Sequence, residues 1–287
     1  MKKNIQWALL ILLATIIRWS TGVFVKSLHL PATTIVVFRL GIPLICMTAY
    51  LLYTKKKFGL SHNKLAWKFS SWNAIRMLLY YIGFNLTTVA NAVIGLYTRP
   101  LFAAMIEYYR TKKITPVVLL CTLLWLGWVI ITCLDKSFWT QPLQMLGFFA
   151  ITTSAVISAL QRFRQKDLMV HADNVQMVFY QSLVGTIVFF PFLFINKPMP
   201  TIHQSTIAII FSLLIGIAGF YLYFTWLRKV SIAYMSVLSY FEVISAILFA
   251  YFIIHEVPSG YTLAGGAIII LSILIISLHK KTVQSDT

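Results

Sequence analysis

Long apolar runs, separated by short polar or basic clusters, fill most of this chain of 287 residues. A helix needs about twenty mostly apolar residues to cross a bilayer, and runs of that length recur ten times. The expected membrane spans are residues 5–25, 34–53, 70–88, 90–109, 115–134, 143–162, 174–195, 206–227, 232–254 and 261–279. The pattern therefore predicts an all-α integral membrane protein with ten transmembrane helices. The break between the third and fourth spans depends only on the polar residues from Asn85 to Asn91, and the count would be nine without it.

The composition also indicates a membrane protein. Hydrophobic residues make up 59% of the chain and charged residues 11%, with a mean hydropathy of +0.82, which leaves too few polar side chains to cover a water-soluble globule. A formal charge of +17 would suggest a nucleic acid partner in a soluble protein, but here the basic residues stand in short clusters between apolar runs. We expect a lipid bilayer around this chain and no nucleic acid partner.

The basic residues predict how the chain is oriented. With the N-terminus in the cytoplasm, 17 of the 24 Lys and Arg residues fall on the cytoplasmic side, and four lie within spans. Only Lys26, Lys136 and Lys197 fall outside. Because cytoplasmic loops are the ones that retain Lys and Arg, this asymmetry favours ten spans with both termini in the cytoplasm.

The stretch Leu78–Lys113 recurs in altered form at Tyr221–Glu256. Residue types are kept in the pairs Tyr80/Tyr223, Ala90/Ala233, Tyr97/Tyr240, Ala103/Ala246 and Tyr108/Tyr251. In the same register Arg99 falls on Glu242, so the charge changes sign where the apolar positions are kept. The chain is therefore built from two related halves.

Five spans per half is an odd number, so the second half must enter the membrane from the opposite side. We predict two inverted five-helix repeats, residues 1–137 and 138–287. Inversion explains a second change of sign, because Lys113 ends a helix on the inner face and its counterpart Glu256 ends one on the outer face, where basic residues are disfavoured. Inverted repeats are a common construction of secondary transporters, so the repeat predicts transport by alternating access.

The second half carries a motif at its end. The run Ser236–Ala246 is followed by His255-Glu256 and then by Gly265-Gly266-Ala267. This arrangement resembles the S-x-L-x-x-L-E-P-V-x-A…G-E…G-A signature of the EamA-type branch of the drug/metabolite transporter superfamily. The spacing is kept, although His255 replaces the usual glycine and Val243 the usual proline.

The first half is similar to the same family in its opening motifs, at Trp19–Lys26 and at Phe38-Arg39. The resemblance covers both repeats and implies a multi-pass carrier of the bacterial inner membrane. Because this superfamily handles amino acids, nucleotide derivatives, polyamines, drugs and sugars, membership does not identify the substrate.

Ionisable residues inside the expected spans are candidates for binding. They are Arg18, Arg39, Arg76, Arg99, Glu107 and Glu242. Each costs roughly 2.5–3.5 kcal/mol on insertion scales. Arg99 and Glu242 lie near the bilayer midplane, where transporters bind their substrates. Either the two pair and bridge the fourth and ninth helices, or Arg99 binds a substrate carboxylate or phosphate while Glu242 faces a cation or titrates.

The other charged positions have alternatives nearer the surface. For Arg39 we favour snorkelling to the outer headgroups over a role in binding, while Arg18 either snorkels or faces the cavity. For Arg76 and Glu107, snorkelling or mutual pairing is favoured over substrate binding. Aromatic rings within the spans can stack on a planar substrate or hold a cation, with interfacial belts and ordinary packing as the alternative. The aromatic set is Trp19, Tyr80, Tyr81, Tyr97, Tyr223, Trp226 and Tyr240, of which Trp19, Tyr80, Tyr223 and Tyr240 are the candidates for substrate binding.

These observations predict a secondary transporter of a small metabolite. Four arginines against two glutamates within the spans favour an anionic or zwitterionic solute, such as an amino acid or a nucleotide-like compound like S-adenosylmethionine. Proton coupling, exchange for a counter-solute and facilitated transport all stay open, as do import or export and a monomer or a homodimer. The alternatives are an exporter of drugs or organic cations, or a non-transporting membrane binding protein. The sequence holds no catalytic motif and no metal-ligand spacing, so we expect no enzyme, metal or cofactor.

Overall fold

The computed structural model describes residues 21–55, 63–96, 98–99, 141–171, 174–195, 199–219 and 248–257, with a few single positions between them. Within these residues the chain forms helices and turns and no strand. Most of the expected spans 5–25, 115–134 and 261–279 lie outside the described residues, as does most of the repeat segment 221–256. The ten-span inverted arrangement therefore stays a prediction.

The first half contains helices α2 (Thr21–Leu28), α3 (Ala32–Thr54), α4 (Asn63–Leu86) and α5 (Val89–Leu96). Helix α3 matches the second expected span almost residue for residue. The predicted break after the third span is confirmed, because α4 ends and α5 begins around Thr87 and Thr88. The Thr88 hydroxyl accepts a 3.2 Å hydrogen bond from the backbone N–H of Asn91, which caps the start of α5 and explains the break there.

The second half contains α9 (Pro142–His171), α10 (Asn174–Phe189), α11 (Phe192–Ile195), α12 (Ile202–Phe211) and the π-helix η2 (Ser212–Gly219), followed by a helical segment at 248–254. Helix α9 is longer than its expected span. The expected span 174–195 is interrupted between α10 and α11, at Pro191, which has no N–H to continue the helix.

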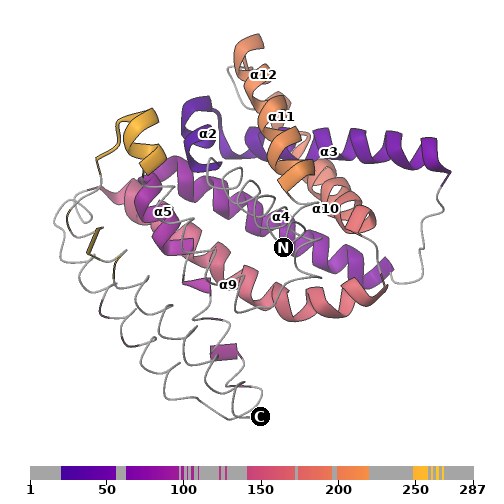
Figure 1. Cartoon of the computed structure of the whole chain (residues 1–287), viewed down its shortest axis with the longest axis horizontal. Helices are drawn as coiled ribbons and strands as arrows, with labels where there is room; N and C mark the ends of the chain where they lie inside the picture. Colours follow the sequence, from indigo (N-terminus) through magenta and orange to yellow (C-terminus); the bar gives the residue numbers. More distant parts are fainter. Residues whose placement is uncertain are drawn as a thin grey trace, which may run out of the picture.

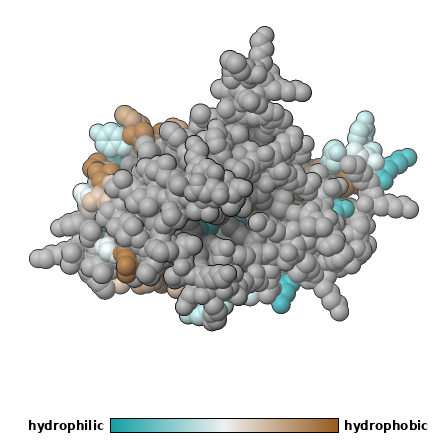
Figure 2. All heavy atoms as spheres, turned by 60° about the horizontal axis from the view of Figure 1, so that its bottom comes forward, coloured by the Kyte–Doolittle hydropathy of each residue, from teal (hydrophilic) through white to brown (hydrophobic). Residues whose placement is uncertain are grey.

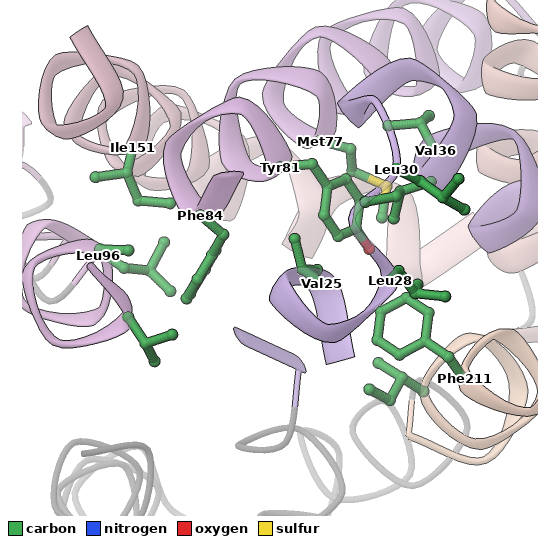
Figure 3. Packing of buried hydrophobic residues seen from close by; sticks show 14 of the residues in the cluster. Val25, Leu28, Leu30, Val36, Met77, Tyr81, Phe84, Leu96, Ile151 and Phe211 are labelled. Atoms are coloured by element: carbon green, nitrogen blue, oxygen red, sulfur yellow. The ribbon is translucent and has the colours of Figure 1, made fainter. Parts of the chain in front are cut away.

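The helices pack as a bundle in which α4 lies alongside α9 and α10 lies between α3 and α4 (Figure 1). Close approach of α4 and α9 depends on Gly83, since a Cβ atom there would lie 2.7 Å from Cβ of Ile151. The core draws side chains from both halves, and Figure 3 shows Phe84 of α4 beside Leu96 and Ile151. Elements of both halves therefore share one buried core.

Three described helical segments are long and apolar enough to cross a membrane: Ala32–Thr54, Pro142–Gln161 and Ile202–Gly219. Their outward faces are apolar as well, since large hydrophobic residues such as Leu52, Phe149 and Ile210 are exposed. Figure 2 shows brown, apolar atoms exposed on the left of the face it presents. Exposed apolar helix faces of this length suit lipid rather than water, so the chain is a membrane protein.

Candidate functional site

The most buried charge among the described residues is Arg39 on α3, which is 4% exposed. Its Nη2 atom donates a 2.9 Å hydrogen bond to the backbone carbonyl of Ile215 in η2. The expectation that Arg39 snorkels to the outer headgroups was therefore wrong. The residue turns inward because a carbonyl of the π-helix is within its reach.

The neighbours of Arg39 shape the space around the guanidinium. Its Cζ atom lies 5.9 Å from the ring centroid of Phe211, at the end of α12. A Cβ atom on Gly216 would lie 2.5 Å from Nη1 of Arg39 and 2.6 Å from Cγ of Pro43. Only glycine leaves the room that this contact needs, so the sequence of η2 is matched to the arginine of α3.

Arg39 also contacts Tyr81 of α4. This tyrosine is fully buried, receives a side-chain hydrogen bond from Arg39 and lies in the electrostatic field of Arg76. Figure 3 shows its ring among Val25, Leu28, Leu30 and Met77, with its oxygen directed away from α4. The sequence had favoured the adjacent Tyr80, whose half-buried ring packs edge-on against Tyr81 at 5.2 Å.

Arg76 belongs to a polar network between α4, α9 and α10. Its Nε and Nη2 atoms donate to Oδ1 of Asn73, at 3.1 and 2.8 Å. Asn73 in turn donates from Nδ2 to Oε1 of Gln181, at 3.2 Å. The hydroxyl of Ser154 donates to the backbone carbonyl of Arg76 at 3.0 Å. The side chain is thus directed to buried amides and not to the inner surface, while the alternative partner Glu107 lies outside the described residues.

The remaining predicted site residues are less fully placed. Arg99 is half-buried and its Nε donates to the carbonyl of Leu96 at 3.3 Å. Arg18, Trp19, Tyr223, Tyr240 and Glu242 lie outside the described residues. Whether Arg99 pairs with Glu242 or binds a substrate therefore stays a prediction.

Two residues of the family-like motifs meet at another point. Nζ of Lys26, near the end of α2, lies 3.0 Å from Oε2 of Glu256, after the helical segment 248–254. The sequence had assigned both residues to the outer side of the membrane. Their contact is consistent with that assignment.

Sequence reasoning missed Asn73 and Gln181 as site residues. Asn73 and Gln181 carried a usable signal, because amides within apolar spans need hydrogen-bond partners. Tyr81 belonged to the aromatic set that the sequence put forward, but nothing in the sequence distinguished it from the adjacent Tyr80. Together, the buried Arg39, the partly buried Arg76 and the buried Tyr81 bring two positive charges and a hydroxyl group into one part of the core.

Comparison with solved structures supports the fold. One crystal structure of a protein is 17% identical to this chain, covers 96% of this chain and 97% of its own, and superimposes with a TM-score of 0.64. At this identity the likeness shows the fold alone. No curated protein sequence matches the chain significantly.

A family model matches the second half of the chain. The matched residues, 145–278, include η2 with its Ile215 carbonyl, the run Ser236–Ala246 and Glu256. The match is consistent with the drug/metabolite transporter superfamily. Residues 145–278, slightly under half of the chain, match the model of the EamA-like transporter family, so this part of the chain is similar to that family.

Proposed function

We propose that this protein is a secondary transporter that moves a small anionic or zwitterionic metabolite across the bacterial inner membrane by alternating access. It has ten helices in two inverted five-helix halves, with both termini in the cytoplasm. The carrier is coupled to a proton, exchanges its solute for a counter-solute, or runs as a facilitator, and the three are separated by the dependence of transport on an imposed pH gradient and on a preloaded counter-solute. An amino acid or a nucleotide-like compound such as S-adenosylmethionine has the required carboxylate, phosphate or planar ring.

The observation that carries this proposal is the burial of Arg39 at a contact between the two halves of the chain. Its guanidinium reaches a backbone carbonyl of η2 and also Tyr81, which lies near Arg76. Arginine is retained inside membrane proteins mainly where it pairs or lines a solute pathway. A cationic interior raises the local concentration of anions and opposes organic cations.

Counterflow in liposomes tests the proposal. Purified protein is reconstituted into vesicles preloaded in turn with amino acids, S-adenosylmethionine, nucleotides or organic cations, and uptake of the labelled compound is followed. We expect accumulation with one anionic or zwitterionic class. Accumulation with organic cations alone would favour the drug exporter, and none with folded protein would favour a binding protein.

Variants then assign the site. Arg99→Gln is expected to reduce counterflow of the accepted solute by at least tenfold, since loss of one charge-assisted contact costs about 1.5–3 kcal/mol. Lys68→Gln is the matched control, because Lys68 is exposed on α4 and its substitution also removes one positive charge. Equal activity of the two variants would contradict substrate binding by Arg99.

A further inference from the structure

The turn between α2 and α3, residues 26–31, is held by side chains from three other elements. Glu256 pairs with Lys26, and Nε2 of Gln204 on α12 donates to the carbonyl of Leu28 at 2.9 Å. From α4, Nδ2 of Asn85 donates to the carbonyl of Leu30 at 3.0 Å. All of these residues lie at helix ends that the sequence assigns to the outer side. Two of the three contacts come from the second half of the chain, so this turn fastens the halves together.

The ion pair is well shielded for a surface contact. The side chains of Lys26 and Glu256 are 23% and 13% exposed. The second carboxylate oxygen of Glu256, Oε1, is buried and has no hydrogen-bond partner among the described residues. Glu256 therefore depends on Lys26 for compensation of its charge, and separating the two is unfavourable unless water reaches both.

Tight turns fix both partners in place. His29 follows α2 with φ of +50°, and both its backbone N–H, at 3.3 Å, and its ring Nδ1 contact the carbonyl of Lys26. His255 precedes Glu256 with φ of +58°, and the N–H of Glu256 donates to the carbonyl of Ala250 at 3.1 Å. Each charged residue is therefore held by a short left-handed turn.

Closely packed apolar residues lie beside the pair. Phe24 of α2 packs against Phe211 of α12 with ring centroids 5.5 Å apart. Ala250 is 2% exposed and belongs to the same core cluster as Leu28. In this arrangement α12 packs against α2, and the segment 248–254 shares a buried core with α2.

We propose that Lys26 and Glu256 form a latch that holds the outer side of the transporter closed and separates when that side opens. The inference rests on the proposed alternating access and sidedness. Opening the outer side hydrates both charges, so the cost of separation falls in the outward-open state. Breaking the latch must therefore shift the population toward that state and away from the inward-open one.

Cysteine labelling tests this shift without any transport substrate. The three native cysteines are replaced by alanine, and a membrane-impermeant maleimide is applied to vesicles of either orientation. Ala250→Cys reports on the outer side, and Ser70→Cys, 1% exposed near the inner end of α4, reports on the inner side. Ser27→Cys, already exposed on α2, is the control. Each reporter is combined with Lys26→Glu and with the charge swap Lys26→Glu/Glu256→Lys.

We expect Lys26→Glu to raise the labelling rate at position 250 about fivefold or more and to lower the rate at position 70, with position 27 unchanged. The charge swap is expected to return both rates toward those of the unmodified latch. Phe24→Cys, half-buried against Phe211, is a second outer reporter if Ala250→Cys does not elute as folded protein.

Opposite changes at the two reporters distinguish a latch from a merely structural pair. If both rates rise together, or neither changes, the latch is wrong. If the charge swap behaves like Lys26→Glu, attraction between these two residues is not the cause. Labelling of Ser27→Cys from the inner side only would instead contradict the sidedness, and so the proposed function.

Discussion

Arg39 on α3 and Ile215 in the π-helix η2 are 176 positions apart in sequence, yet Nη2 of the arginine donates a 2.9 Å hydrogen bond to the isoleucine carbonyl. A π-helix widens the helical turn and often occurs at functional sites. The arginine therefore joins a helix of the first half to an irregular segment of the second. In the alternating-access cycle proposed above the two halves move relative to each other, and this contact would have to change in that movement.

Arg39→Leu is expected to lower the stability of the protein in detergent and to reduce counterflow by at least tenfold. The change removes a charge-assisted hydrogen bond and leaves the carbonyl of Ile215 without this donor, at a cost of about 1.5–3 kcal/mol. Thermal unfolding and counterflow of the same preparation measure the two effects.

Arg39→Lys separates charge from geometry. Lysine keeps the positive charge but has no planar fork to reach Ile215 and Tyr81 together, so we expect partial stability and low counterflow. Full counterflow by Arg39→Lys would show that only the charge matters. Unchanged stability of Arg39→Leu would contradict the role of the contact.

Gly216→Ala tests the close approach of η2 and α3. The new methyl group would meet Nη1 of Arg39 at 2.5 Å and Cγ of Pro43 at 2.6 Å, and the proline ring has little freedom to move. Overpacking of this kind costs about 1–3 kcal/mol, so we expect a lower unfolding temperature.

The matched control is Gly41→Ala, on α3. Its nearest new neighbour is Thr186, at 3.8 Å, which is ordinary contact. Alanine favours a helix over glycine by about 1 kcal/mol, so this variant is expected to be equally or more stable. An equal loss of stability in both variants would rule out the contact with Arg39 as the reason for glycine at position 216.

The pair Asn73 and Gln181 is expected to couple energetically. Both side chains are buried, and Asn73 also accepts from Arg76. Removing either amide leaves polar atoms without a partner, so Asn73→Leu and Gln181→Leu are each expected to destabilise the protein by about 1–3 kcal/mol.

A double-mutant cycle measures this coupling. Since the partner is already lost, the double variant is expected to be less destabilised than the sum of the two single variants, by about 0.5–3 kcal/mol. Strict additivity would mean that the 3.2 Å contact contributes nothing.

The sequence predicted the helices well where one physical rule dominates. The length of the apolar run was enough to predict α3. The break predicted between Asn85 and Asn91 is present in the structure, where the hydroxyl of Thr88 caps the start of α5. The interruption at Pro191 was missed, although proline in an expected span is a recognised signal. Helix α9 continues beyond its apolar run, so the length of that run could not predict the residue at which the helix ends.

The candidate site was harder to predict because sequence fixes depth in the membrane but not direction around a helix. Arg39 lies near the outer end of its span, so snorkelling and an inward contact were both open. The glycine at position 216 and the π-helical carbonyl of Ile215 decided between them. Neither is visible without the packing of α3 against η2.

His255 is one of the positions at which this chain departs from the family-like motif, and its backbone conformation leads to the last prediction. The motif usually carries glycine at this position, and the backbone here has φ of +58°, where glycine is favoured. A side chain in this region costs about 1–2 kcal/mol, partly offset because glycine is more flexible when unfolded, by roughly 0.5–1 kcal/mol. His255→Gly is therefore expected to raise the unfolding temperature by about 1–3 °C.

The comparison variant is His29→Gly, at φ of +50°. Its gain in unfolding temperature is expected to be smaller, since the ring Nδ1 of His29 also contacts the carbonyl of Lys26. A lower unfolding temperature for His255→Gly would mean that the histidine ring makes a stabilising contact that outweighs the strain of its backbone.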